Sequence, residues 1–100
     1  MTTNRVTLVG YVGTHLATQK LNNGSIRVVL RIATHEQDTG TTWHKVAAFN
    51  ATAAFAARNF VKGSHIMVEG HLTYLPYADA TGRSHYTTVV HANYLVNLDR

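Results

Sequence analysis

The chain has 100 residues, 45% hydrophobic and 14% charged, and its nine Lys and Arg against five Asp and Glu give a net charge of +4. This length predicts one domain over residues 1–100 with a modest core, and the low charge argues against a disordered chain. The absence of cysteine excludes disulfides, thiolate metal sites and cysteine nucleophiles. No apolar run approaches the ~20 residues of a membrane span. The basic bias fits a polyanionic partner, and the seven histidines would strengthen anion binding in mild acid.

The chain begins with a predicted strand over residues 4–12, where apolar and polar side chains alternate. Gly10 and Gly13 indicate a bulge or a tight bend, which is how strands curve into small barrels. Asn23-Gly24 is a strong signal for a hairpin turn, and Lys20 lies just before it.

Residues 25–34 give the clearest strand pattern of the chain, with every even residue from Ile26 to Ile32 apolar. Arg27 and Arg31 fall on the opposite face, where they are either solvated or in contact with phosphates. The polar residues 35–41 form a loop that joins this strand to the next as a hairpin.

The strand predicted over residues 42–49 places Trp43 and Phe49 on one face, because they are six residues apart. Lys45 and the small Ala47 share that face. Flat rings and a cation on one sheet surface are what stacked nucleobases and their phosphates require. The alternative is that both rings belong to the core, where strand aromatics are commonly found.

Alanine-rich residues 50–61 form the one predicted helix, with Asn50 as its N-cap and Gly63 ending it. Its packing face comprises Ala53, Ala56, Ala57 and Phe60. Two long strands follow, over residues 64–77 and 85–97, joined by the loop 78–84. The fold class is therefore all-β: a five-stranded OB-fold barrel with one helix between strands 3 and 4.

The chemistry that an enzyme needs is missing from this sequence. Of the five acidic residues, Glu36 and Asp38 lie in a predicted solvated loop, and Glu69 and Asp79 are isolated from each other. The histidines lack metal-ligand spacing, and no glycine-rich phosphate loop occurs. Two histidines paired across strands could still hold a metal. The sequence otherwise predicts no enzyme, no cofactor and no metal.

Six stretches together resemble the bacterial single-stranded DNA-binding protein family: NRVTLVGYVG, the NNG turn, VVLRIAT, TTWHKVAAFN, FVKGSHIMVEGHL and GRSHYTTVVHANYL. The likeness covers nearly the whole chain. It implies an OB-fold that binds single-stranded DNA without sequence preference in replication, recombination and repair. It also implies a homotetramer, favoured over a dimer, in the cytoplasm at the nucleoid.

The resemblance assigns roles to individual residues. Trp43 and Phe49 match stacking positions, and Tyr77 matches a third aromatic of the fourth strand. Lys45, Lys62 and Arg5 match cations, and we add Arg31 and Arg83 as weaker phosphate contacts. His44 matches a histidine of subunit contacts; a buried, hydrogen-bonded histidine is the simpler interpretation. The expected partners are single-stranded DNA and further copies of the chain, with no membrane.

Several departures from the family lower the expected affinity. The loop 35–41 lacks the family's aromatic, and residues 73–77 lack the cations that precede its strand-four aromatic. The acidic tail that recruits replication partners is not found in these residues, so recruitment through a tail is not supported. Two other functions stay open: a replication-restart accessory with weak DNA binding, and a scaffold for protein assembly.

Overall fold

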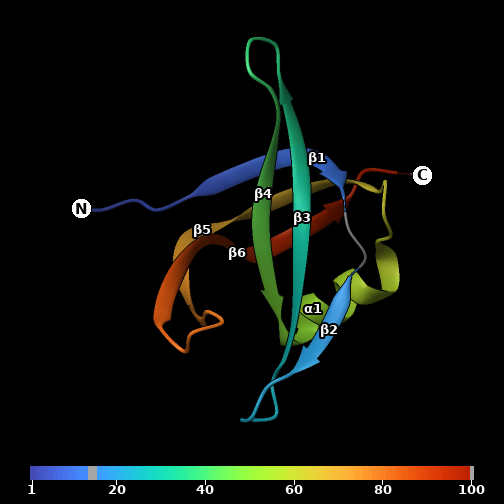
Figure 1. Cartoon of the computed structure of the whole chain (residues 1–100). Helices are drawn as coiled ribbons and strands as arrows, with labels where there is room; N and C mark the ends of the chain where they lie inside the picture. The colour runs from blue at the N-terminus through green and yellow to red at the C-terminus, as the bar shows by residue number, and fades with distance from the viewer. Residues whose placement is uncertain (14–15, 100) are drawn as a thin grey trace.

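The computed structural model describes residues 1–13 and 16–99, apart from the side chains of residues 17 and 77. Within these residues the chain forms six strands and one helix (Figure 1). In chain order they are β1 (Val6–Val12), β2 (Ala17–Lys20), β3 (Ile26–Glu36), β4 (Gly40–Phe49), α1 (Asn50–Asn59), β5 (His65–Ala78) and β6 (Ser84–Asn97).

Five of the strands close into a barrel. Their order is β1-β5-β6-β4-β3, and a second pairing of β1 with β3 closes the ring. All these pairings are antiparallel except the short parallel contact between β4 and β6. The helix lies between the third and fourth barrel strands, β4 and β5, so the predicted OB-fold is confirmed.

The sequence did not reveal β2, which pairs with β3 beside the barrel. This strand has only four residues, too few for a reliable alternation. It forms because the predicted turn at Asn23-Gly24 folds it back onto β3, with Gly24 at a φ of 89°.

The core forms as the alternation in β3 predicts: Val28, Leu30 and Ile32 are fully buried. They pack with apolar residues of the other barrel strands and with α1. The helix buries Ala53 and Ala56, and Phe60 just beyond its end is buried too. Ala57, predicted on the same face, is exposed.

The helix differs from its prediction at both ends. Phe49, not Asn50, is the N-cap, and no side chain caps the first turn. Asn50 has a φ of 52°, and its side-chain oxygen instead accepts a hydrogen bond from the Ile26 backbone N–H at 3.3 Å. Asparagine tolerates this left-handed conformation better than most residues. The helix ends at Asn59, two residues before the predicted end, where the backbone turns extended at Phe60.

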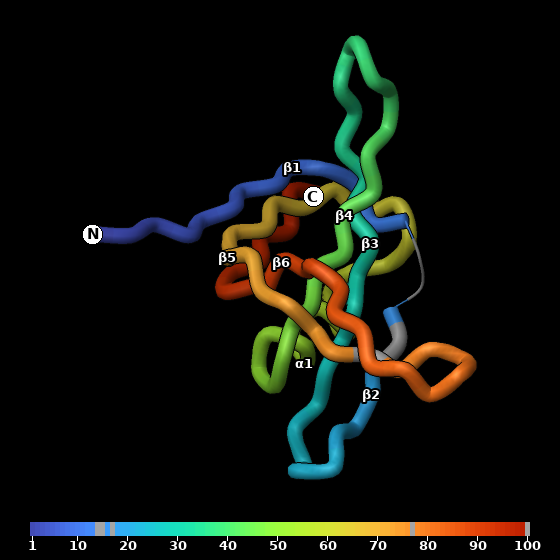
Figure 2. Tube along the Cα trace, turned by 60° about the vertical axis from the view of Figure 1, so that its left-hand side comes forward, coloured from blue at the N-terminus to red at the C-terminus, as the bar shows by residue number. Residues whose placement is uncertain are grey.

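Two hairpins project from the barrel. β3 and β4 extend to Glu36 and Gly40, so the predicted loop 35–41 shrinks to residues 37–39. Their tip rises beyond β1 in both views (Figures 1 and 2). The second projection, which we call the arm, is the end of the β5–β6 hairpin from residue 72 to residue 90. The register between the two strands shifts at Glu69/Gly70, just before the arm begins.

Candidate nucleic-acid interface

The odd-numbered residues of β3 and β4 share the face of the sheet that points away from the core. The register pairs Ala33 with Trp43 and Arg31 with Lys45 on this face. Val29 pairs with Ala47, and Arg27 with Phe49. We call this surface the outer face. The predicted grouping of Trp43, Lys45, Ala47 and Phe49 on one side of the strand is confirmed by this register.

Trp43 lies half-exposed on the outer face, with 49% of its surface accessible. Gly13 donates its backbone N–H to the Arg31 carbonyl at 2.8 Å, which places Gly13 on the far side of β3 from Trp43. The indole reaches across β3, and a methyl group at Gly13 would overlap its Cζ3 and Cη2 atoms. The guanidinium carbon of Arg31 lies 5.4 Å from the ring centroid, within the range of a cation–π contact. Glycine therefore provides the space in which the ring rests.

A cationic groove lies between the outer face and the arm. It has a volume of about 490 Å³ and is lined by Arg27, Val29 and Lys45 on one side and by Leu75, Pro76 and Thr87 on the other. A smaller hollow of about 190 Å³ connects Trp43, His44 and Lys45 with arm residues Leu72 and Thr88. Lys45 lines both, so a chain of phosphates and bases following the arm would pass this cation.

Phe49 is half-buried at the opposite end of the outer face. Its ring stacks on His91 of β6, with a centroid distance of 5.1 Å and an interplanar angle of 22°. Ala47, between the two aromatics, is fully buried because β6 pairs beside it. The core alternative therefore does not hold for Trp43 and holds in part for Phe49.

The remaining predicted cations lie away from the two aromatics. Arg5 precedes β1 and its Nη2 donates to Glu69 Oε1 at 2.7 Å. This hydrogen bond, with the attraction of the charges, raises the pKa of Arg5 and lowers the pKa of Glu69. Lys62 is exposed in the turn between α1 and β5, and Arg83 is exposed at the arm tip. The structure thus brings Arg31 and Lys45 together with Trp43, but not Arg5, Lys62 or Arg83.

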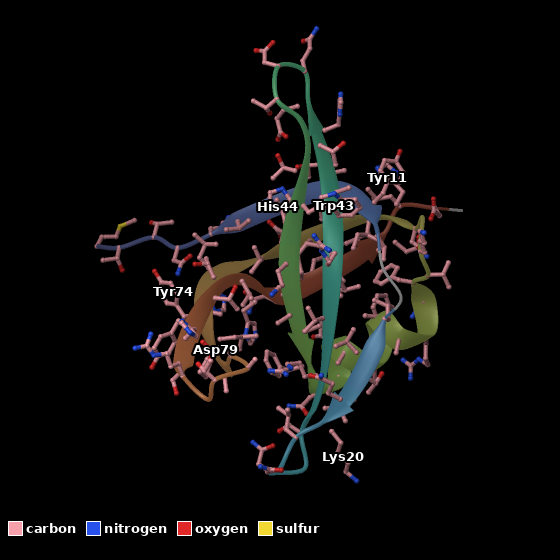
Figure 3. The ribbon with its side chains drawn as sticks, viewed as in Figure 1. Tyr11, Lys20, Trp43, His44, Tyr74 and Asp79 are labelled. Atoms are coloured by element: carbon pink, nitrogen blue, oxygen red, sulfur yellow. The ribbon has the colours of Figure 1, made fainter. Side chains whose placement is uncertain are left out.

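His44 and Tyr77 have less direct support. The His44 ring is half-buried, and its Nε2 lies 2.8 Å from Thr34 Oγ1, as the simpler interpretation expects. A role for His44 at a subunit contact stays a prediction. Figure 3 shows Trp43 and His44 where the β3–β4 hairpin crosses β1. The Tyr77 side chain lies outside the described residues; its backbone pairs with His85 in the arm.

The described residues contain neither a cluster of metal ligands nor a membrane-spanning helix. No group of three or more His, Asp or Glu there is arranged to hold a metal ion. One cross-strand histidine pair does exist, His71 with His91, but the rings are stacked rather than converging on one point. The single helix seen in residues 1–13 and 16–99 is not long and apolar enough to cross a membrane.

Sequence reasoning missed the roles of Gly13 and His91. The sequence indicates only a bend at Gly13, whereas its contact with Trp43 depends on pairing between β1 and β3. His91 reaches Phe49 through the parallel pairing of β4 with β6 at Ala47, which spans more than forty residues of chain. Alternation along the last strand groups His91 with its same-face neighbours, but that signal does not say which strand lies beside it.

The geometry combines an exposed ring, a permanent cation above it and a basic groove along an OB-fold arm. The model of the single-strand binding protein family matches residues 3–98 of the chain. This match covers all of the elements described above. It supports single-stranded DNA binding, the non-enzymatic activity of this family. The chain therefore belongs to the single-strand binding protein family.

Proposed function

We propose that the chain coats single-stranded DNA without sequence preference, by stacking bases on Trp43 and Phe49. The observation that carries this proposal is the half-exposed Trp43 ring, which lies beside Arg31 and lines the smaller hollow together with Lys45. Every base has a flat face, so stacking tolerates any sequence. Tyr77 would add a third ring from the arm, in agreement with its backbone position in β5.

The phosphates would be neutralised first by Arg31 and Lys45, which are next to the bases. Arg27 lines the same groove but its Nε and Nη2 both donate to Gln19 Oε1, at 3.1 and 2.6 Å. Arg5 would have to share its charge with Glu69, which makes it a weaker contact. Lys62 and Arg83 would extend the path at its ends.

The proposed setting is transient single-stranded DNA during replication, recombination and repair, in the cytoplasm at the nucleoid. We propose a homotetramer with His44 at a subunit contact. The support is the family match together with the large side chains that one copy leaves exposed outside the groove, such as Val9, Tyr11 and Tyr94.

The test uses Trp43, the single tryptophan of the chain. Short oligo(dT) is titrated into the protein, and tryptophan fluorescence is followed at low and at moderate salt. Stacking quenches the indole fluorescence. Counterion release makes the affinity fall with salt: the logarithm of the binding constant falls against the logarithm of the salt concentration with a slope of about 0.7 for each phosphate contact.

Quenching that weakens with salt is the expected result, and its stoichiometry gives the number of nucleotides per subunit. A folded protein whose fluorescence does not respond to oligo(dT) at either salt concentration would overturn the stacking mechanism. In that event an assembly scaffold becomes the better proposal. A mass measurement in solution, independent of DNA, tests the tetramer.

A further inference from the structure

Three aromatic rings form a row across the outer face of β4, β6 and β5. Phe49 stacks on His91, and His91 stacks on His71 with centroids 4.9 Å apart and an interplanar angle of 19°. The His71 Nδ1 is 2.9 Å from Asn93 Oδ1. We call the rings of Phe49, His91 and His71 the ring row. It continues the aromatic surface of β4 beyond the residues that the family resemblance identifies.

The row exists because of two unusual pairings. The parallel contact of β4 with β6 places Ala47 opposite His91. Phe49, two residues further along β4, therefore reaches His91 diagonally. The antiparallel pairing of β5 with β6 places His71 directly opposite His91. Gly70 permits this approach, since a methyl group there would overlap the His91 carbonyl oxygen. The row is thus fixed by the backbone.

The row ends at an open hollow of about 480 Å³, lined by Asn4, Arg5, Glu69, Gly70, His71, Asn93 and Tyr94. The nearest charges on β5 and before β1 are Glu69 and Arg5, which pair with each other. On the other side are Lys45 of β4 and Arg27 of β3, which line the groove. Tyr94 is the other titratable residue of β6 that lines this hollow. A neighbouring hollow beside Asn93 and Tyr94 is lined by Ala51, Thr52 and Phe55 of α1, none of which titrates.

This neighbourhood suits an anion better than a metal. Nearly parallel rings direct their nitrogen lone pairs along parallel planes, so they do not converge on one ion. The one carboxylate in the hollow already accepts a hydrogen bond from Arg5. Burial, and then repulsion from His71, lower the pKa of His91, and a negative charge beside the ring would act in the opposite direction.

We propose that the ring row is part of the path of single-stranded DNA, and that His71 and His91 form a phosphate contact that takes up a proton when DNA binds. This inference rests on the proposed function. It adds two contact residues to the interface, and it makes one part of the interface respond to pH.

The physical reason is linkage between proton and phosphate. A phosphate beside the pair stabilises an imidazolium and offsets the repulsion between the two rings, so it raises the pKa of the pair in the complex. Affinity must then increase as the pH falls toward the ordinary range of histidine. A rise of about one pKa unit in the complex gives at most about a tenfold increase in affinity.

The experiment measures the affinity for short oligo(dT) by Trp43 quenching at about pH 8 and about pH 5.5, each over a series of salt concentrations. Thymine has no group that titrates between these values. We expect binding to be severalfold tighter at the lower pH, and at most about tenfold for a rise of about one pKa unit. We also expect a steeper salt dependence there, by about 0.7 for one additional phosphate contact.

Three variants separate charge from packing. His91→Phe keeps a flat ring in the row but cannot take up a proton, and His71→Gln removes the second imidazole. Each variant is compared with its own affinity at pH 8, and each should lose most of the tightening and steepening in acid. His35→Gln is the matched control, because His35 is exposed near the tip of the β3–β4 hairpin. It should keep both effects.

The outcomes distinguish this inference from the function on which it rests. Binding at pH 8 without extra tightening or steepening in acid overturns the ring-row contact and leaves the stacking function intact. The contact is likewise overturned if His91→Phe and His71→Gln keep both acid effects. If the unmodified chain does not bind oligo(dT) at pH 8 or at pH 5.5, the ring-row contact and the proposed stacking function are both overturned. Circular dichroism checks that each variant is folded. Because His91→Phe and His71→Gln change different rings, each tests the proposal without the other.

Discussion

The two ends of the β4 outer face carry the same kind of residue in different surroundings. Trp43 rests on Gly13 beneath Arg31, whose charge is permanent, and half of its surface is open. Phe49, six residues away on the same strand face, is half-buried against His91, which carries charge only when protonated. Spacing along one strand therefore sets the face on which a ring lies, while the neighbouring strands set how exposed the ring is and which charge it meets.

Replacing each ring by alanine should separate the two ends most clearly. Trp43→Ala should weaken oligo(dT) binding by about 1–3 kcal/mol with little change in the free energy of unfolding. Phe49→Ala should reduce the free energy of unfolding as well, by about 0.5–3 kcal/mol, because it also leaves His91 without its ring contact. Anisotropy of a labelled oligonucleotide and urea denaturation measure the two quantities.

The matched control for these variants is Tyr86→Ala. Tyr86 is 73% exposed and does not line the groove. It should leave both quantities nearly unchanged for an oligonucleotide that fills one site. If Trp43→Ala unfolds the protein and spares DNA affinity wherever the chain stays folded, Trp43 is a core residue and the contrast between the ends disappears.

Two glycine substitutions test whether the position of the Trp43 ring affects DNA binding separately from the stability of the barrel. Gly13→Ala places a methyl group against the movable indole, so the ring should shift while the barrel stays folded; we expect about 1 kcal/mol weaker DNA binding. Gly10→Ala places its methyl group against the Ala33 backbone carbonyl instead, and it should destabilise the barrel by about 1–3 kcal/mol. Thermal unfolding with DNA titration compares them. Equal loss of stability in both variants would contradict the difference.

Arg31→Gln tests the permanent charge over Trp43. It should remove a cation–π contact worth about 0.5–1 kcal/mol. It should also make the logarithm of the DNA-binding constant fall less steeply with the logarithm of the salt concentration, by about 0.7 in slope. Lys20→Gln loses the same charge at the far end of the β2–β3 hairpin (Figure 3) and should keep the slope. Identical salt slopes for the two variants would show that Arg31 acts only through net charge.

The smallest effect concerns the arm tip. Hydrogen bonds from Thr81 and His85 are the main causes that lower the pKa of Asp79 from 3.8 to about 2. A carboxyl group whose pKa is depressed on folding stabilises the fold above its unfolded pKa, and this contribution is lost as the pH falls through about 2. Carbon-13 NMR titration of the Asp79 carboxyl should therefore find its midpoint well below that of an exposed aspartate. An ordinary midpoint would mean that the tip is open.

Much of the barrel could be predicted because its signals are local. The even residues of β3, the Asn23-Gly24 turn and the six-residue spacing of Trp43 and Phe49 each follow from alternation or turn geometry. The missed features depend on pairings distant in sequence. β2 forms only by pairing with β3, and the Asn50 side-chain oxygen accepts a hydrogen bond from the Ile26 backbone N–H instead of capping the helix.

The site was predictable to the same degree. The even spacing in β4 sufficed to group Trp43 with Lys45, and family likeness added cations that the fold places elsewhere, such as Lys62 in the turn after the helix. Nothing in the sequence indicates that Gly13 lies under Trp43 or that His91 covers Phe49. Both contacts arise where the sheet closes on itself, through β1–β3 and β4–β6 pairing.

The Asp79 turn has a kinetic consequence. One carboxylate accepts hydrogen bonds from the Thr81 and Arg83 backbone N–H groups, from the Thr81 hydroxyl and from His85. Ordering a loop at the moment of binding would consume conformational entropy, on the order of 1 kcal/mol for each residue. Because this tip is already ordered, the arm meets its ligand in a pre-organised shape. Association should then be limited by diffusion and steering rather than by closure of the arm.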